Sequence, residues 1–290
     1  MMDVALITCA KYLAPDPHNA LVSLAIYEDA LMVEHYARLG LTARRVDWAD
    51  PAVDWSRVGR AVIRALWDYQ DKPAAFTAWL DSVEGKTRIV NAPAVIRWNL
   101  DKRYLHDLER ARVAVVPTLF VPDDMPLPAV FAHFGCDEIV VKPTISASGC
   151  DTFRVARGQD FAARFDALRA GKALMAQPFV PEILAGGEVS LIAIAGRVTH
   201  AVRKVPGPGG FLVQEEHGGA TVPHAVTREE EAFAARVLAA CPPGVIYARI
   251  DIVHGPDGPR VMEVEAFEPL LFFRFHAPAA RALADAALGA

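Results

Sequence analysis

The chain has 290 residues, of which 53% are hydrophobic and 22% charged, and its formal net charge is −5. This apolar content is ample for a packed core and excludes a mainly disordered chain, and the length favours two domains or one fold with several lobes. The mild acidity argues against a protein that coats nucleic acid, although a locally positive pocket could still bind a nucleotide.

The start of the chain lacks the positive segment and apolar run of a signal peptide, and no stretch has the roughly 18 apolar residues of a membrane span. Cys9, Cys136, Cys150 and Cys241 show no Cys-x-x-Cys spacing, so we expect them to be reduced and mostly buried. We therefore expect a cytoplasmic protein without membrane or nucleic-acid partners. The Ala- and Arg-rich composition suggests a bacterial source.

Strand-like and helix-like segments alternate in the first part of the chain. Strands are predicted at 3–9, 41–46, 60–69 and 87–90, and helices at 20–39 and 73–83. Gly40 suits the residue that follows a helix. This order is typical of an open parallel sheet with helical cover, so the sequence predicts an α/β fold.

The later elements are shorter and include antiparallel pairs. Helices are predicted at 101–111, 125–135, 158–170, 227–240 and 278–288, and strands at 115–121, 137–143, 153–156, 173–182, 188–205, 244–253 and 259–267. The segment 188–205 is predicted to be a hairpin that turns at Ala195 and Gly196, because glycine adopts the positive φ of tight turns. A polar, glycine-rich loop follows at 206–219.

Three carboxylates mark the last two predicted strands. Asp251 lies in an otherwise apolar strand, and Glu263 and Glu265 are two residues apart on the next, so they share a face. Carboxylates that converge in an apolar sheet need a cation, and Mg²⁺ prefers oxygen ligands. The alternative is a solvated face with alternating glutamates. Glu268, just beyond, could be a ligand, a substrate contact or a member of a loop salt bridge.

Lys142 ends a predicted buried strand and leads into the small-residue loop 144–151. Ser148 and Gly149 would let the backbone of this loop approach a phosphate, whose oxygens its N–H groups can bind. The segment has neither the Walker A pattern nor G-x-G-x-x-G, and the alternative is an ordinary lysine between a strand and a turn.

Three further positions suit a nucleotide-dependent reaction. Arg249 shares a strand face with Asp251, where a guanidinium would stabilise an oxyanion, the alternative being a cross-strand ion pair. Gln177 precedes a proline, where a strand breaks and leaves backbone groups for a flat base. Arg203 precedes the glycine-rich loop. The absence of G-x-S-x-G and of a Cys–His pair disfavours a covalent hydrolase.

The order of these segments resembles the ATP-grasp superfamily. It runs from Lys102 and Lys142 through AQPFVPE, GEVSL, HAVRK, the glycine-rich loop and ARIDI to MEVE. The pattern resembles the glutathione-synthetase-like branch and D-alanine–D-alanine ligases. The segments VIRALWDY, IRWNLDKRYLHDL, VQEEHGG and EAFEPLLFF are similar to those of cyclo-ligases that form D-cycloserine from O-ureido-D-serine. The resemblance spans residues 3–290.

The resemblance implies three lobes. They are an N-terminal substrate-binding α/β lobe at 1–95, a small central ATP-grasp lobe at 96–178, and a C-terminal ATP-grasp lobe with the metal site at 179–290. Nucleotide would lie between the last two lobes. Dimers are common in this branch, so a homodimer is expected.

The resemblance also implies roles for individual residues. The implied nucleotide-binding residues are Lys102, Lys142, Ser148, Gly149, Gln177, Phe179, Val180 and Glu188. The implied ligands for two Mg²⁺ ions, which Mn²⁺ could replace, are Asp251, Glu263 and Glu265. Arg203 would meet the γ-phosphate and Arg249 would stabilise a tetrahedral intermediate. Many relatives have asparagine at the position of Glu265, so this site carries extra negative charge.

The implied activity is that of an ATP-dependent carboxylate–amine ligase. A substrate carboxylate attacks the γ-phosphorus of ATP to give an acyl phosphate and ADP, and an amine then displaces phosphate from the acyl carbon. Phosphoryl transfer needs positioning and charge neutralisation and no side-chain nucleophile. The alternatives are a cyclo-ligase that closes a ring within one molecule, a kinase, and a nucleotide-binding regulatory protein without turnover.

The substrate is expected to be small and amino-acid-like, bound where the N-terminal strand ends meet the ATP site. The candidate contacts are Tyr12, Arg64, Trp67, Asp68, Tyr69 and Glu268. Arg64 suits a carboxylate and Asp68 an ammonium group. The alternative for the aromatic residues is core packing. Ala65 follows Arg64 where the cyclo-ligase pattern often has serine, so the cycloserine substrate is not carried over.

Overall fold

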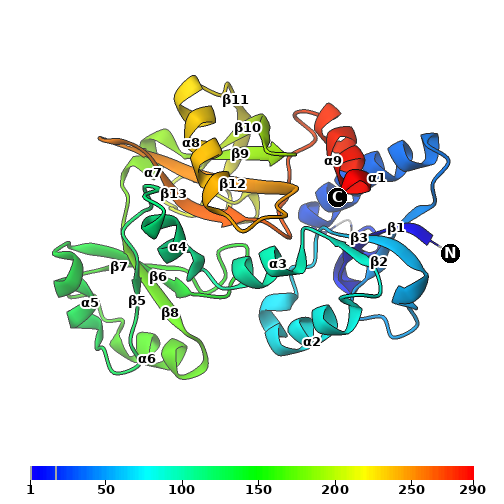
Figure 1. Ribbon diagram of the computed structural model, residues 1–290. Helices are drawn as coiled ribbons and strands as arrows, with labels where there is room; N and C mark the ends of the chain where they lie inside the picture. Colours follow the sequence, from blue (N-terminus) through cyan, green and yellow to red (C-terminus); the bar gives the residue numbers. More distant parts are fainter. Residues whose placement is uncertain (1, 17) are drawn as a thin grey trace.

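Three β-sheets with helices packed beside them make up the computed structural model, which describes residues 2–16 and 18–290 (Figure 1). Two of the sheets have four strands and the third has five. This mixture of strands and helices confirms the predicted α/β class.

The N-terminal sheet, blue and cyan in Figure 1, is wholly parallel and has the strand order β2-β1-β3-β4. Its elements are β1 (Met2–Thr8), α1 (Ala20–Arg38), β2 (Ala43–Asp47), β3 (Val58–Ile63), α2 (Pro73–Val83) and β4 (Arg88–Val90). The prediction of a strand over 60–69 is wrong in its second half. Because β1 ends at Thr8 and β4 at Val90, the chain beyond Ile63 has no strand to pair with.

Two helices connect this sheet to the next. They are α3 (Pro93–Leu100) and α4 (Tyr104–Arg110). The second corresponds to the predicted helix 101–111, whereas the first was not predicted, although Pro93 suits the first position of a helix.

The central sheet, green in Figure 1, is antiparallel and has the order β5-β8-β6-β7. Its elements are β5 (Leu119–Phe120), α5 (Leu127–Phe134), β6 (Glu138–Pro143), β7 (Phe153–Ala156), α6 (Ala162–Gly171) and β8 (Leu174–Pro178). β8 ends at Pro178 rather than continuing to 182, because proline has no amide for the ladder.

The C-terminal sheet has the order β11-β10-β9-β12-β13 and is antiparallel. Its elements are α7 (Glu182–Gly186), β9 (Glu188–Ile194), β10 (Arg197–Val205), β11 (Ala220–His224), α8 (Arg228–Ala240), β12 (Tyr247–Gly255) and β13 (Gly258–Glu265). Ala195 and Gly196, with φ of 49° and 77°, form the predicted hairpin turn. α7 and the largely exposed β11 were not predicted, because they are short and lack a clear apolar period.

The last helix, α9 (Pro278–Gly289), lies against α1 of the N-terminal sheet (Figure 1). His35 and Asp285 are 2.7 Å apart across this contact, and the Tyr36 hydroxyl donates to the carbonyl of Ala284. The chain thus returns to its N-terminal lobe at its end. The three lobe boundaries drawn from the sequence stay a prediction.

The central sheet has a hydrophobic core of its own, which includes Val130, Val141 and Phe165. Another core is shared by the N-terminal and C-terminal sheets, and Leu6 and Tyr247 both belong to it. The packing therefore ties these two sheets together, and a third core joins Met175 of the central sheet to the C-terminal sheet.

All four cysteines are free, as predicted. The expectation that most are buried holds only for Cys9, since Cys150 is exposed and Cys136 and Cys241 are partly buried. Within the described part of the chain, we find no helix with both the length and the apolarity to cross a membrane.

Candidate active site

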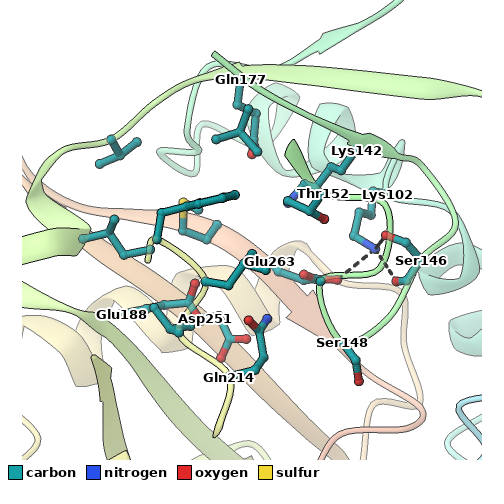
Figure 2. A pocket seen from close by; sticks show the side chains of 18 of the residues that line it. Lys102, Lys142, Ser146, Ser148, Thr152, Gln177, Glu188, Gln214, Asp251 and Glu263 are labelled. Atoms are coloured by element: carbon teal, nitrogen blue, oxygen red, sulfur yellow. Dashed lines mark hydrogen bonds and ion pairs between the residues drawn. The ribbon is translucent and has the colours of Figure 1, made fainter. Parts of the chain in front are cut away.

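The first cavity lies between the central and C-terminal sheets (Figure 2). The predicted nucleotide and metal residues that line it are Lys102, Lys142, Ser148, Gly149, Gln177, Phe179, Val180, Glu188, Arg249, Asp251, Glu263 and Glu265. In Figure 2, Glu188, Asp251 and Glu263 face the two lysines and the loop 144–151 across the cavity. The structure thus brings these distant segments together.

One face of the β12–β13 hairpin carries the charged groups. Arg249 is paired with Glu265 and Asp251 with Glu263 in the strand register, so the four side chains form two neighbouring rows. Alternation along each strand places them on one face, and the hairpin places the strands side by side. The predicted sharing of a face by Arg249 and Asp251 is therefore realised.

Asp251 is held by three neighbours. It accepts a hydrogen bond from Ser190 Oγ at 2.6 Å, from Arg249 Nη2 at 2.9 Å and from Lys204 Nζ at 3.1 Å. Burial opposes its charge, but Arg249 and Lys204 hold the pKa of Asp251 far below its ordinary value. Asp251 is therefore an ionised carboxylate in a buried site.

Glu188 and Lys204 form an ion pair of 2.5 Å beside Asp251. Burial opposes the lysine charge, yet the carboxylates of Asp251 and Glu188 raise the pKa of Lys204. Burial raises the pKa of Glu188, which the ammonium of Lys204 partly counteracts. Lys204 thus serves both carboxylates.

The predicted metal residues supply oxygen donors, the kind that Mg²⁺ prefers. Burial, with the nearby carboxylates of Glu268 and Glu263, raises the pKa of Glu265 well above its ordinary value despite its ion pair with Arg249. A divalent cation would offset this excess of negative charge, so the donor set fits one. Among the described residues, no three His, Cys, Asp or Glu side chains are gathered as metal ligands; the carboxylates of this site are paired with lysine and arginine side chains instead.

The lysines and the small-residue loop form the opposite wall. Lys102 donates to the Ser146 carbonyl at 2.7 Å and lies 3.1 Å from Glu263 Oε1. Burial lowers the pKa of Lys142, which makes no ion pair with any described residue. Ser148 and Gly149 have positive φ of 53° and 67°, which turns the loop tightly. These groups suit an anionic ligand.

The far end of the cavity is formed where β8 ends. Gln177 is 2% exposed and donates to Thr118 Oγ1 at 2.9 Å. The guanidinium of Arg154 lies 3.7 Å from the ring centre of Phe179. The amide of Phe179 already donates to the carbonyl of Glu138, so it is not a free donor for a base.

Arg203 lines neither cavity and is exposed, which corrects its assignment to the γ-phosphate. Side chains of β10 alternate, so Lys204 points inward where Arg203 points to solvent. Lys204 lines the second cavity, contacts Glu188 and Asp251 of the first, and is the buried cation of this strand.

The second cavity adjoins the first and has a volume of about 350 Å³. Arg249, Glu265, Gln214 and the loop residues Ala147 and Ser148 line both cavities. Its remaining walls are His18, Asn19, Ala20, Leu21, Leu24, Trp67, Lys204, Glu215, Glu216, Thr221, Glu268, Leu270 and Phe272. It therefore lies between the start of α1, the loop 206–219 and the segment after β13.

Glu268 and Trp67 are the predicted substrate residues that line this second cavity. Glu268 accepts from Trp67 Nε1 at 2.6 Å and from the Tyr69 hydroxyl at 3.0 Å. Burial raises the pKa of Glu268 to about 6. Tyr69 itself is in the core and reaches the cavity wall only through its hydrogen bond to Glu268.

Arg64 is buried away from both cavities, which corrects its assignment to a substrate carboxylate. Its guanidinium donates to Glu28 at 2.7 Å and to Asp29 at 3.0 Å. Glu28 in turn accepts from the amides of Leu271 and Phe273. Arg64 thus ties α1 to the segment that follows β13.

Asp68 and Tyr12 also line neither cavity. Asp68 accepts from Trp48 Nε1 at 2.8 Å and from Lys72 at 3.0 Å, so its charge is already paired. Tyr12 is buried edge-to-face against Trp67, with ring centres 5.0 Å apart. Both placements correct the expectation of substrate contact.

Gln214 and the start of α1 also line the second cavity, and neither was predicted from the sequence. Gln214 lies in the segment VQEEHGG, which contributed to the resemblance but was given no role. No local pattern marks the start of α1, because it reaches the cavity only through the packing of the lobes.

Comparisons with known proteins agree with this geometry. The N-terminal domain family of D-cycloserine synthetase DcsG matches residues 4–91, and the ATP-grasp domain family of prokaryotic glutathione synthetase matches residues 112–272. The cycloserine biosynthesis protein DcsG of Streptomyces lavendulae is 34% identical over 288 residues, covering 91% of this chain and 94% of that protein. A probable alpha-L-glutamate ligase of Rhodopirellula baltica is 28% identical over 61% of this chain and 43% of its own length.

Solved structures share the fold. The crystal structure of D-cycloserine synthetase DcsG superposes with a TM-score of 0.84 over 98% of this chain and 97% of that one, at 30% identity. D-alanine–D-alanine ligase from Bacillus anthracis superposes with a TM-score of 0.70 over 100% and 97%, at 13% identity. The predicted resemblance is confirmed: the chain belongs to the ATP-grasp family of ATP-dependent ligases that form C–N bonds.

Proposed function

We propose that this chain activates the carboxylate of a small amino acid with ATP and closes it onto a nitrogen of the same molecule, as a cyclo-ligase of the D-cycloserine-forming type. The observation that supports this most is the pair of adjoining cavities that share Arg249 and Glu265. One provides lysines for a polyphosphate, and the other takes a small second ligand next to it.

ATP would bind in the first cavity with its base near Gln177 and its phosphates toward Lys102 and Lys142. Ser148 and Gly149, whose positive φ turns the loop tightly, line this space, and their amides would bind phosphate oxygens. Because Lys142 has no ion-pair partner among the described residues, a phosphate would supply the negative charge that it lacks.

Asp251, Glu263 and Glu265 would hold Mg²⁺, and we propose two ions, replaceable by Mn²⁺. Bound Mg²⁺ would neutralise charge on the phosphates. Lys102 and Lys204 already contact carboxylates of this set, so both can turn from a carboxylate to a phosphate as ligands bind.

The reaction follows from this arrangement. A substrate carboxylate oxygen forms a bond to the γ-phosphorus, the bond to the ADP oxygen breaks, and ADP leaves. A nitrogen of the substrate then attacks the acyl carbon, loses its proton to solvent, and phosphate departs. Arg249, where the cavities meet, would stabilise the oxyanion of the second step.

Two observations favour ring closure over the joining of two molecules. The second cavity, at about 350 Å³, lies at the small end of the range for ligand sites, about 300–1,000 Å³. The N-terminal lobe matches the family of the D-cycloserine synthetase DcsG domain. Joining two molecules remains the second candidate, favoured by the likeness to probable alpha-L-glutamate ligases. We further propose a cytoplasmic homodimer that takes small molecules as its only partners.

The test is ADP release with Mg²⁺ and ATP, using O-ureido-D-serine and a panel of D- and L-amino acids, with hydroxylamine present to trap acyl phosphate. Hydroxamate from one acid, together with a cyclic product by mass spectrometry, is expected. An acid that yields hydroxamate, but whose product without hydroxylamine is only intermolecular, would overturn ring closure.

A matched pair of variants checks the site. Lys142→Met should lower ADP release at least 100-fold and leave the fold intact, because no ion-pair partner is left behind. Lys86→Met removes the same charge from the exposed surface and should leave activity unchanged. Equal activity of both variants would refute the phosphate contact.

A further inference from the structure

Glu268 is a buried carboxylate in the wall of the second cavity. It is 4% exposed, and each oxygen accepts one hydrogen bond, from Trp67 and from Tyr69. Trp67 is in turn packed edge-to-face against Tyr12. These contacts fix the direction of the carboxylate but bring no positive charge to it.

Glu268 differs in this respect from the other carboxylates of the site. Asp251 is paired with Arg249 and Lys204, Glu263 with Lys102, and Glu265 with Arg249. Within the described part of the chain, Glu268 forms no salt bridge. A buried charge without a partner is costly, so a cationic group of a ligand would be strongly favoured there.

The other acidic groups near the second cavity are less suited to a cation. Glu215 is paired with Arg274, and Glu216 is exposed to solvent at the rim. Asp68, the ammonium site expected from the sequence, is paired with Lys72 and lies outside the cavity. Glu268 is thus the acidic group whose negative charge a cationic group of a ligand can neutralise.

Arg249 lies close to Glu268 along the same wall. Its Nη1 donates to the carbonyl of Leu270, two residues beyond Glu268, whose own carbonyl accepts from Trp67. An anionic group and a cationic group of one small molecule can therefore meet Arg249 and Glu268 together. An α-amino acid carries this pair of charges on one carbon.

We infer that Glu268 binds the ammonium group of the substrate, so that the enzyme selects α-amino acids with a free amine over the matching 2-hydroxy acids. The inference rests on the proposed carboxylate activation and deepens it. The substrate carboxylate would face Arg249 and the first cavity, while its ammonium group meets Glu268.

The experiment compares each acid with its hydroxy analogue in wild type and Glu268→Gln. The probes are O-ureido-D-serine, D-serine and D-alanine, each against the acid with a hydroxyl in place of the amine. Wild type should favour the amino acid at least 100-fold in kcat/KM for hydroxamate formation. Glu268→Gln should lose that preference through a fall with the amino acid alone.

Two further variants separate recognition from structure. Glu268→Asp keeps the charge and should keep the preference. Glu231→Gln removes one negative charge from the exposed face of α8, outside both cavities, and should change nothing. Equal losses on both members of a pair, or an unchanged preference in Glu268→Gln, would overturn the inference.

Binding by calorimetry keeps the inference apart from the proposed function. Amino acids that bind through Glu268 without any hydroxamate would overturn carboxylate activation and leave the inference standing. Hydroxy acids that bind wild type as tightly as amino acids would overturn the inference, even with full turnover.

Discussion

The replacement of Lys204 by methionine is the sharpest test of which cation of β10 serves the active site. Its ammonium is buried between Glu188, at 2.5 Å, and Asp251, at 3.1 Å. Methionine is similar in length but leaves these carboxylates with less positive charge. Arg203→Met is the matched control, because Arg203 is the next residue and faces solvent.

The expected magnitude follows from the two lost contacts. Removing one partner of a buried ion pair costs about 3–5 kcal/mol, because the other charge stays buried and unpaired. Arg249 still neutralises Asp251, so the lower part of this range is expected for the free energy of unfolding of Lys204→Met. An exposed substitution such as Arg203→Met changes it by about 0.5 kcal/mol or less.

Urea unfolding and ADP release measure the two effects. We expect kcat to fall about 10²–10³-fold in Lys204→Met, the usual loss when one preorganised charged donor is removed from a reaction site. Arg203→Met should stay within twofold of wild type. A tenfold loss in Arg203→Met, or a Lys204→Met protein as stable and active as wild type, would refute the placement of these side chains.

Three more outcomes are expected. Arg64→Met should lower the free energy of unfolding, measured by urea denaturation, by about 3–5 kcal/mol, since two buried carboxylates lose their partner. The KM for the amino acid should stay the same, and a raised KM with full stability would contradict this. Tyr69→Phe should raise the KM for the amino acid several-fold in steady-state kinetics, because Glu268 loses one of the donors that orient it. An unchanged KM would contradict this. Burial lowers the pKa of His200 from 6.5 to about 4. Between these two pH values, His200 is protonated in the unfolded chain and neutral in the folded protein. Stability should therefore fall by at most about 3 kcal/mol as the pH drops from 6.5 to 4, and His200→Gln should remove this part of the slope in unfolding measured at each pH.

The charged face of the hairpin could be predicted because two local rules determine it. Residues two apart share a strand face, and strands joined by a short turn are neighbours, so Arg249, Asp251, Glu263 and Glu265 had to meet. The order of the surrounding segments then identified the family. These features depend on short stretches of sequence.

The exchange of Arg203 for Lys204 could not be foreseen in this way. β10 has a register shift between Val198 and His200, and one extra residue reverses which side chains of a strand face inward. The misplaced substrate residues have another cause. The carboxylates that bind Arg64 lie on α1, and only the packing of α1 on the sheet brings them there.

The loop 144–151 lines both cavities and is tied by hydrogen bonds to two other parts of the chain. Ala147 and Ser148 of this loop face both cavities. The amide of Ala147 donates to Gln70 Oε1 of the N-terminal lobe at 2.7 Å, and the carbonyl oxygen of Ser148 lies 2.9 Å from His217 Nε2. A displacement of this loop would break both hydrogen bonds and open both cavities to water at once. While the loop stays in place, an acyl phosphate formed in the proposed reaction would be shielded from water for as long as ADP is enclosed. Hydrolysis of this intermediate and release of ADP would then depend on the same loop movement.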